Sequence, residues 1–232
     1  MFCTAFNASR RSARKVRDMQ KPGTPVLHPR LDDRGKPVLI LKPSCPSDLA
    51  AWSDPNATAC VVPDGPMPDE VNGLSVARWS DAPTTEVGWE ALASQNQIEA
   101  PDFVVPSGYK PAAGAVIREA DGRIWLVAPS NAYGGYQATL PKGTMGGKSA
   151  HATALVETFE ETGLRVRLVK HLVDVKRSQS YTRYYLAERL GGSPADMGWE
   201  SQAVMLVPPD QLCSRLGSPR DTPILNRLLS TL

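Results

Sequence analysis

Residues 140–164 of the chain read LPKGTMGGKSAHATALVETFEETGL. The glycines of the first half favour a loop that ends near Lys148. Residues 150–162 favour a helix, and Gly163 suits the C-cap of that helix because glycine readily adopts left-handed backbone angles. On such a helix Glu157 lies three residues before Glu160 and four before Glu161, so the three carboxylates share one face near one end.

The three carboxylates repel one another, and no basic residue lies between positions 149 and 164 to relieve that repulsion. A hard divalent cation would supply the missing positive charge, because Mg²⁺ prefers oxygen ligands such as carboxylates. By spacing alone, a solvated acidic turn with nothing bound explains the pattern equally well. The surroundings favour the metal, since the backbone amides of a glycine-rich loop can approach a phosphate closely. Lys142 and Lys148 add positive charge at the same place.

A metal between a phosphate and carboxylates suits attack on a phosphoanhydride, with a carboxylate as general base. Gly147-Lys148-Ser149 also resembles the end of a P-loop. Lys142 stands where that motif needs its first glycine, and no buried apolar strand precedes the loop. A P-loop also gives no reason for three convergent glutamates, so we favour the metal-assisted interpretation.

The segment resembles the signature of the Nudix hydrolase superfamily. That signature is Gly, five residues, Glu, seven residues, Arg-Glu, an apolar residue, any residue, Glu-Glu, any residue, Gly and an apolar residue. Its second half is present here as Glu157, Glu160-Glu161 and Gly163-Leu164. The resemblance covers about residues 107–229 and implies an α/β fold, a Nudix-type α/β/α sandwich with a mixed sheet.

The box, residues 143–164, departs from the signature in three ways. It is one residue short, so the first glutamate of the signature falls at Lys148 or Ser149. The arginine position holds Val156, and the apolar position after Glu157 holds a threonine. In the family that arginine orients the glutamates, so its absence predicts a looser metal site.

The resemblance implies roles for several residues. Glu157, Glu160 and Glu161 would bind Mg²⁺, with Mn²⁺ as the alternative ion, and Glu160 or Glu161 would also act in catalysis. Glu200, in a later loop, is a candidate general base or an ordinary exposed glutamate. Lys142 and the backbone from Gly143 onward would steady phosphate.

Three further residues are candidate substrate contacts. Arg183 lies on an expected strand facing the box and would either grip a phosphate with both arms of its guanidinium or face solvent. Tyr133 and Tyr136 flank two glycines and would either stack on a base or pack against the protein.

The implied reaction is Mg²⁺-dependent hydrolysis of a nucleoside diphosphate linked to another moiety, with a nucleotide-type small molecule as substrate. The degenerate box supports a second hypothesis, a catalytically weak or inactive sensor or partner module that binds a nucleotide without cleaving it. A purely structural protein is the third class, and it would need neither metal nor nucleotide.

Charge and cysteine content exclude other classes. The 232 residues include 26 Lys and Arg against 24 Asp and Glu, so the net charge of +2 gives no reason to expect nucleic acid as a partner. No apolar run approaches the roughly 20 residues of a membrane span. The four cysteines form no CxxC pair, which disfavours a zinc site or a disulfide framework, and we expect a cytoplasmic protein.

Proline content divides the chain, because 14 of its 21 prolines fall within residues 1–111. We expect a basic tail at 1–20, with an organellar transit peptide as the alternative, then a small Pro-rich, mostly β N-terminal module of unknown role at 21–105. The Nudix-like domain would span 106–232, and a homodimer stays open. Three tryptophans would form a small core of their own in the module: Trp52, Trp79 and Trp89. The strands expected along the chain lie at 36–42, 57–62, 114–118, 123–128, 164–175, 181–189 and 203–207.

Overall fold

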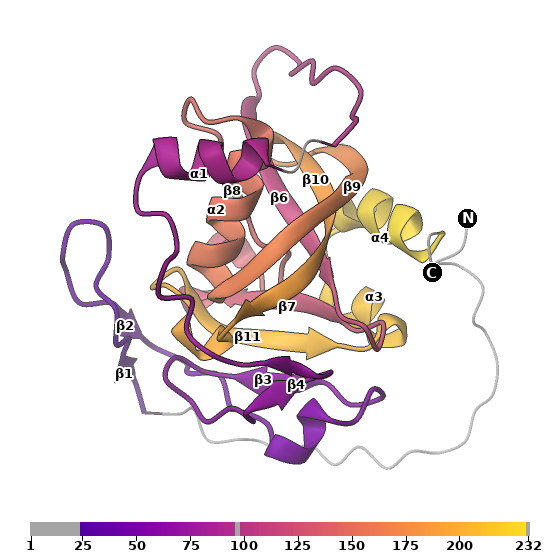
Figure 1. Ribbon diagram of the computed structural model, residues 1–232. Coiled ribbons are helices and arrows are strands. Elements are labelled where there is room, and N and C mark those ends of the chain that lie inside the picture. Colours follow the sequence, from indigo (N-terminus) through magenta and orange to yellow (C-terminus); the bar gives the residue numbers. More distant parts are fainter. Residues whose placement is uncertain (1–23, 96–97, 231–232) are drawn as a thin grey trace.

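The computed structural model describes residues 24–95 and 98–230, and it is built around one mixed sheet (Figure 1). The sheet has seven strands in the order β3-β11-β7-β6-β10-β9, and β8 also pairs with β6. β10 runs parallel to β6, and the other neighbours run antiparallel. The strands are β3 (Ala59–Val61), β6 (Lys110–Arg118), β7 (Ile124–Pro129), β8 (Lys142–Thr144), β9 (Leu164–Lys176), β10 (Ser180–Gly192) and β11 (Ser201–Val207).

Helices cover both faces of this sheet. On one face α2 (Ala150–Thr162) packs over β6, and α1 (Glu86–Ser94) packs beside α2 in the same hydrophobic cluster. On the other face α3 (Leu212–Arg215) and α4 (Thr222–Leu229) contribute to a second cluster. The molecule is therefore the α/β/α sandwich with a mixed sheet that the sequence predicted.

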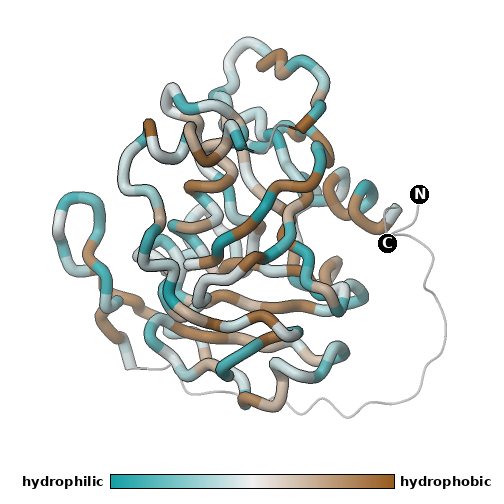
Figure 2. The backbone as a smooth tube through the Cα atoms, in the orientation of Figure 1, coloured by the Kyte–Doolittle hydropathy of each residue, from teal (hydrophilic) through white to brown (hydrophobic). Residues whose placement is uncertain are grey.

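The central strands are buried on both sides. In β6, Ala115 and Ile117 face the α2 layer and Val116 faces the α4 layer, because successive side chains of a strand point to opposite faces. Strands covered on both faces carry nearly continuous apolar runs, and Figure 2 shows hydrophobic colours along the central strands. This burial fixes the register of the sheet and so fixes where its loops emerge.

Within residues 24–95 and 98–105, most of the regular elements are short strands, as predicted. β1 (Val26–Leu27) and β2 (Leu39–Ile40) form a two-stranded ribbon, and β4 (Glu70–Val71) and β5 (Leu74–Ser75) form a small hairpin. A 3₁₀ helix, Leu49–Trp52, precedes β3. β3 itself joins the main sheet by pairing with β11.

Two buried arginines of the larger part of the chain bind backbone carbonyls of this segment. Arg123 is fully buried and donates to the carbonyls of Ala51, Trp52 and Ala57. Arg189 forms a buried ion pair with Glu119 and donates to carbonyls on both sides of the β4–β5 turn. Buried guanidinium groups need such acceptors, so these contacts tie the two parts of the chain together.

The prediction of a separate tryptophan core was wrong. Trp52 packs on Trp125 at 5.8 Å between ring centroids, and Trp89 packs against Phe159 of α2. Both belong to the cluster that underlies α2. Trp52 and Trp89 thus share a hydrophobic core with the rest of the described chain, while the division at residue 105 stays a prediction.

The strands expected from residue 114 onward are present and mostly longer than predicted, whereas those expected at 36–42 and 57–62 are reduced to β2 and β3. The helix at 150–162 ends at Gly163, whose φ of 68° is left-handed. The predicted basic tail at 1–20 lies outside the described residues. Among the residues that the structure describes, no helix has both the length and the apolar character needed to cross a bilayer.

Candidate active site

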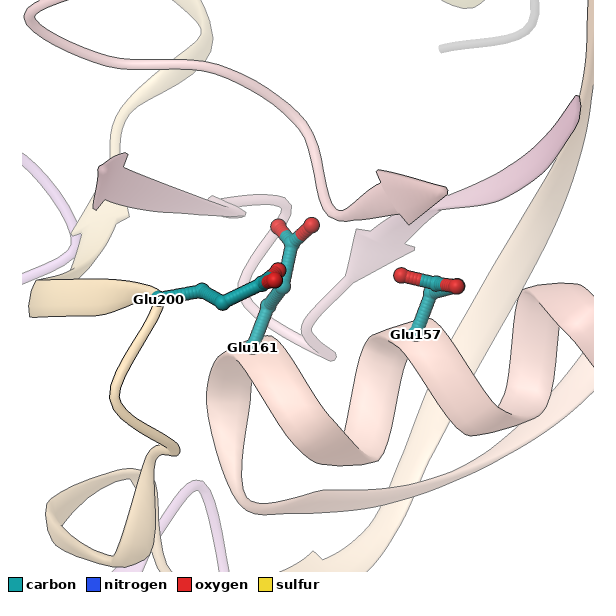
Figure 3. A group of neighbouring side chains, drawn as sticks. All are labelled: Glu157, Glu161 and Glu200. Carbon is teal, nitrogen blue, oxygen red and sulfur yellow. The ribbon is translucent and has the colours of Figure 1, made fainter. Parts of the chain in front are cut away.

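Three carboxylates meet where α2 ends and β11 begins (Figure 3). Glu157 and Glu161 rise from successive turns of α2, and Glu200 reaches toward them from the residue before β11. Each offers an oxygen within 4.8 Å of the other two. The spacing of two glutamates on one helix face was readable from the sequence, whereas the approach of Glu200 depends on the fold.

The strand before the Gly-rich loop lies against these carboxylates. A Cβ at Gly143 would overlap the carboxyl group of Glu157, so only glycine allows the backbone to pass at this point. The amide of Lys142 donates to Oε1 of Glu161 at 3.4 Å. The predicted phosphate-binding residues Lys142 and Gly143 are therefore beside the acidic cluster.

Burial and mutual repulsion make these carboxyl groups weak acids. Burial raises the pKa of Glu157 to about 8, and the charges of Glu160 and Glu200 add to the rise. Burial likewise raises the pKa of Glu161 to about 8, although Lys142 opposes the change. Ionisation of the cluster would concentrate negative charge there, and a bound cation would neutralise that charge.

Glu160 lies on the exposed side of α2 and is not one of the three that converge. Its carbonyl accepts a hydrogen bond from the amide of Gly198 at 2.7 Å. A Cβ at Gly198 would lie 2.6 Å from that carbonyl oxygen, so glycine is needed for this contact. This hydrogen bond fixes the loop that carries Glu200 against the end of α2. The amino-acid sequence gave no sign of the contact.

The ribbon β1–β2 brings one more acid to this place. Trp199 Nε1 donates to Oδ1 of Asp33 at 3.0 Å, which holds Asp33 beside Glu200. Burial raises the pKa of Glu200, the charge of Asp33 raises it further, and Lys142 lowers it. Asp33 was missed because it lies more than 160 residues away in the chain and belongs to no motif.

Arg183 is not free to receive a phosphate. It is buried, and its Nε and Nη2 each donate to a carboxylate oxygen of Asp174 at 2.8 Å. Nη2 also donates to the carbonyl of Pro101, and the guanidinium stacks over Phe103 at 4.6 Å. Arg183 pairs with Ala113 of β6, and Ala113 belongs to the cluster beneath α2. The side chain of Arg183 is therefore on the α2 side of the sheet, as expected.

The two tyrosines of the loop between β7 and β8 differ in exposure. Tyr133 is 84% exposed, whereas Tyr136 is half-buried beneath the guanidinium of Arg177 at 5.8 Å. The loop begins next to the site, since the amide of Ser130 donates to the carbonyl of Glu200 at 2.7 Å. Tyr133 alone of the pair presents most of its ring to solvent.

The carboxylate cluster fits a hard divalent cation. Oxygen donors from carboxylates suit Mg²⁺ and Mn²⁺ and are poor ligands for softer metals. The raised pKa values of Glu157 and Glu161 show the cost of holding these charges without a counter-ion. Two carboxylates on one helix and a third from a loop anchored through its backbone give the cluster a defined shape.

The sequence model of the NUDIX domain matches residues 108–228, just over half of the chain. The chain belongs to the Nudix family. The matched region begins next to β6 and ends within α4, so it includes α2, Glu200 and every strand of the main sheet except β3. Search of curated proteins finds no match.

Solved structures with a similar fold include Nudix enzymes of different kinds. An Ap4A hydrolase from C. elegans is 20% identical, with a TM-score of 0.45 over 52% of this chain and 94% of the other. An ADP-ribose pyrophosphatase from Streptococcus suis is 22% identical, with a TM-score of 0.44 over 53% and 91%. A MutT protein from Methanosarcina mazei is 15% identical, with a TM-score of 0.45 over 55% and 98%. This level of similarity carries no argument about the substrate of the present Nudix protein.

Proposed function

We propose that this Nudix protein is a metal-dependent hydrolase that cleaves the phosphoanhydride of a nucleoside diphosphate linked to another moiety. The observation that carries the proposal is the convergence of Glu157, Glu161 and Glu200 within 4.8 Å beside a glycine-rich loop. Mg²⁺ is the proposed ion, with Mn²⁺ as the alternative, held by Glu157 and Glu161. Glu160 lies on the exposed side of the same turn and would support metal binding from outside the three converging carboxylates.

A bound divalent ion would polarise a phosphoryl oxygen and offset the charge that develops during attack on phosphorus. The chain itself supplies the proton acceptor. Glu200 lies at the edge of the cluster and is exposed, so water can reach its carboxylate. Partial burial and the charge of Asp33 raise its pKa, which makes its carboxylate a stronger base. Glu200 would accept the proton of the attacking water.

Lys142 and the adjacent backbone would bind the substrate phosphates. The amide of Lys142 donates to Glu161, and the charge of the Lys142 side chain lowers the pKa of Glu157, Glu161 and Glu200 alike. A cation there also balances the negative charge of a diphosphate. Tyr133, whose ring is mostly exposed, would stack on a base of the substrate.

A nucleotide sensor is the second candidate function. Its support is the loss of the arginine of the box, since Val156 is buried in the apolar cluster and cannot orient the glutamates. A sensor would bind the same class of ligand and leave the phosphoanhydride intact. A hydrolase and a sensor would both bind the nucleotide, but only the hydrolase would cleave it.

A hydrolysis screen separates these functions. Purified protein would be incubated with ADP-ribose, NADH, diadenosine polyphosphates and nucleoside triphosphates, with Mg²⁺ and with Mn²⁺. We expect turnover on one of them, and a loss of about 10²-fold or more in Glu161→Gln, because the carboxylate acts directly at the reacting centre. Glu188→Gln, a paired surface glutamate of β10, is the matched control and should retain activity. Binding by calorimetry without turnover would instead establish the sensor.

A further inference from the structure

The structure carries a contact between the N-terminal segment and the start of the box helix. Glu90 of α1 accepts two hydrogen bonds from Ser149, one from its amide at 2.6 Å and one from its hydroxyl at 2.8 Å. Ser149 is the N-cap of α2, and the same hydroxyl oxygen accepts from the amide of Ala152 at 3.1 Å. We propose that α1, through Glu90, positions the carboxylates of α2, so that Glu90 is a positioning residue of the proposed active site.

The Glu90 contact is of a strong kind. Hydrogen bonds to an ionised carboxylate are roughly twice as strong as neutral ones. A negative charge at a helix N-terminus also interacts favourably with the helix dipole. Lys148 reinforces the contact, because its ammonium lies 4.0 Å from Glu86 of the same helix. The start of α2 is therefore held from outside the box at two consecutive residues.

A second contact holds α2 nearer its other end. Phe159 lies between the box residues Thr158 and Glu160, and its ring is 5.2 Å from Trp79 and 5.8 Å from Trp89. Trp79 and Trp89 meet edge to face at 5.6 Å. Aromatic packing of this kind restricts rotation of a helix about its axis. Together with Glu90 it fixes both the axial position and the rotation of α2.

A small movement of α2 would displace the carboxylates of Glu157 and Glu161. Gly143 leaves no space between the backbone of β8 and the carboxyl group of Glu157. A helix is a stiff rod that rises 1.5 Å per residue, so a displacement at Ser149 is carried along α2 to Glu157 and Glu161. A misplacement well below that rise changes how the two carboxylates share one cation.

The composition of the box explains why an outside anchor is needed. The position of the orienting arginine holds Val156, which is buried in the apolar cluster. The position of the first glutamate falls at Lys148 or Ser149, and these are the residues that α1 engages. α1 thus restrains the box helix at the place where the box has lost its own polar contacts.

The test measures metal affinity as well as activity, because this inference rests on the proposed function. Mn²⁺ binding to the full chain would be followed by electron paramagnetic resonance without substrate, for wild type, Glu90→Gln, Ser149→Ala and the double variant. We expect each single variant to lose about tenfold in Mn²⁺ affinity, as outer contacts of metal sites commonly do. The double variant should lose less than the two single losses combined, because the Ser149 hydroxyl and Glu90 share one hydrogen bond.

A matched control separates positioning from general stability. Val173 packs against the cluster on the opposite face of the sheet, so we expect Val173→Ala to lower the melting temperature without altering the contacts of α2. We expect Val173→Ala to keep wild-type Mn²⁺ affinity while kcat falls in Glu90→Gln at a little-changed KM. Equal Mn²⁺ affinity in Glu90→Gln and wild type, or a loss that Val173→Ala reproduces at the same melting temperature, overturns the inference and leaves the proposed function intact. A wild-type protein that binds no Mn²⁺ overturns both.

Discussion

Gly143 illustrates how one backbone position controls the candidate metal site. Its missing side chain lets β8 pass against the carboxyl group of Glu157. We expect Gly143→Ala to displace Glu157 and to lower Mn²⁺ affinity and turnover by about tenfold or more, since the metal geometry depends on that carboxylate. Titration with Mn²⁺ and steady-state kinetics would measure both. Gly217→Ala, where a Cβ would meet open space, is the control and should behave as wild type.

The raised pKa values of the box glutamates predict how stability depends on pH. The folded protein holds protons on Glu157 and Glu161 up to a pKa of about 8, while unfolded glutamates release them near 4.5. Between these values the folded state binds more protons, so its free energy of unfolding falls as pH rises. A tenfold difference in proton affinity between the two states corresponds to about 1.4 kcal/mol.

In the presence of a chelator, we therefore expect the melting temperature to decrease from pH 5 to pH 8. Glu157→Gln should flatten this decrease, because a neutral amide has no proton to lose. Added Mg²⁺ or Mn²⁺ should raise the melting temperature most at the upper end of the range, where the carboxylates are ionised. A melting temperature that rises with pH without metal would contradict the assigned burial of these carboxyls.

At the scale of elements, the sequence predicted where the strands and α2 lie along the chain better than it predicted which strands and side chains pair with one another. β6, β7 and α2 were readable because their local patterns and the Gly163 cap lie within short windows. The pairing of β3 with β11, which joins Val61 to Val204, has no local signal. The same holds for the Arg183–Asp174 pair, which turned an expected phosphate contact into an internal one. Such partners depend on the fold as a whole.

The side chain of Asn131 joins the loop between β7 and β8 to the β1–β2 ribbon by two hydrogen bonds, which together form a clip. Asn131 adopts left-handed backbone angles, its Oδ1 accepts from the amide of Leu41 at 2.8 Å, and its Nδ2 donates to the carbonyl of Leu39 at 2.8 Å. We expect Asn131→Ala to speed hydrogen exchange at the Leu41 amide by about five- to tenfold, because that donor loses its acceptor, a contact worth roughly 1 kcal/mol. Exchange measured by NMR would show it.

The same substitution should raise KM more than it lowers kcat if Tyr133 contacts the substrate, since the clip orders the loop that carries Tyr133 and not the carboxylates. Asn226→Ala, on an exposed turn of α4, is the control for a surface asparagine. Unchanged exchange at Leu41 would show that the clip does not hold the loop in solution. Unchanged KM would remove the support for Tyr133 as a substrate contact.

On the scale of the whole molecule, the N-terminal segment completes the fold as well as the site. β3 covers the edge of β11, and Trp52 fills the space over Trp125. Arg123 is fully buried and depends on carbonyls at residues 51–57 for its hydrogen bonds. Removal of these acceptors would leave a buried charge with Asp121 as its remaining ion-pair partner within the described part of the chain.

We therefore expect a chain that begins at residue 106 to lose cooperative unfolding or to aggregate, although it contains the entire matched Nudix domain. Large apolar faces on β11 and α2 would be exposed, and an unpaired sheet edge favours aggregation. Calorimetry and size-exclusion chromatography of the truncated and full chains would measure the difference. Arg123→Met in the truncated chain should recover part of the stability, because it removes the buried charge that has lost its carbonyl acceptors. Unfolding of the truncated chain at the melting temperature of the full protein would instead show that residues 106–232 fold independently, as the sequence-based division at residue 105 proposes.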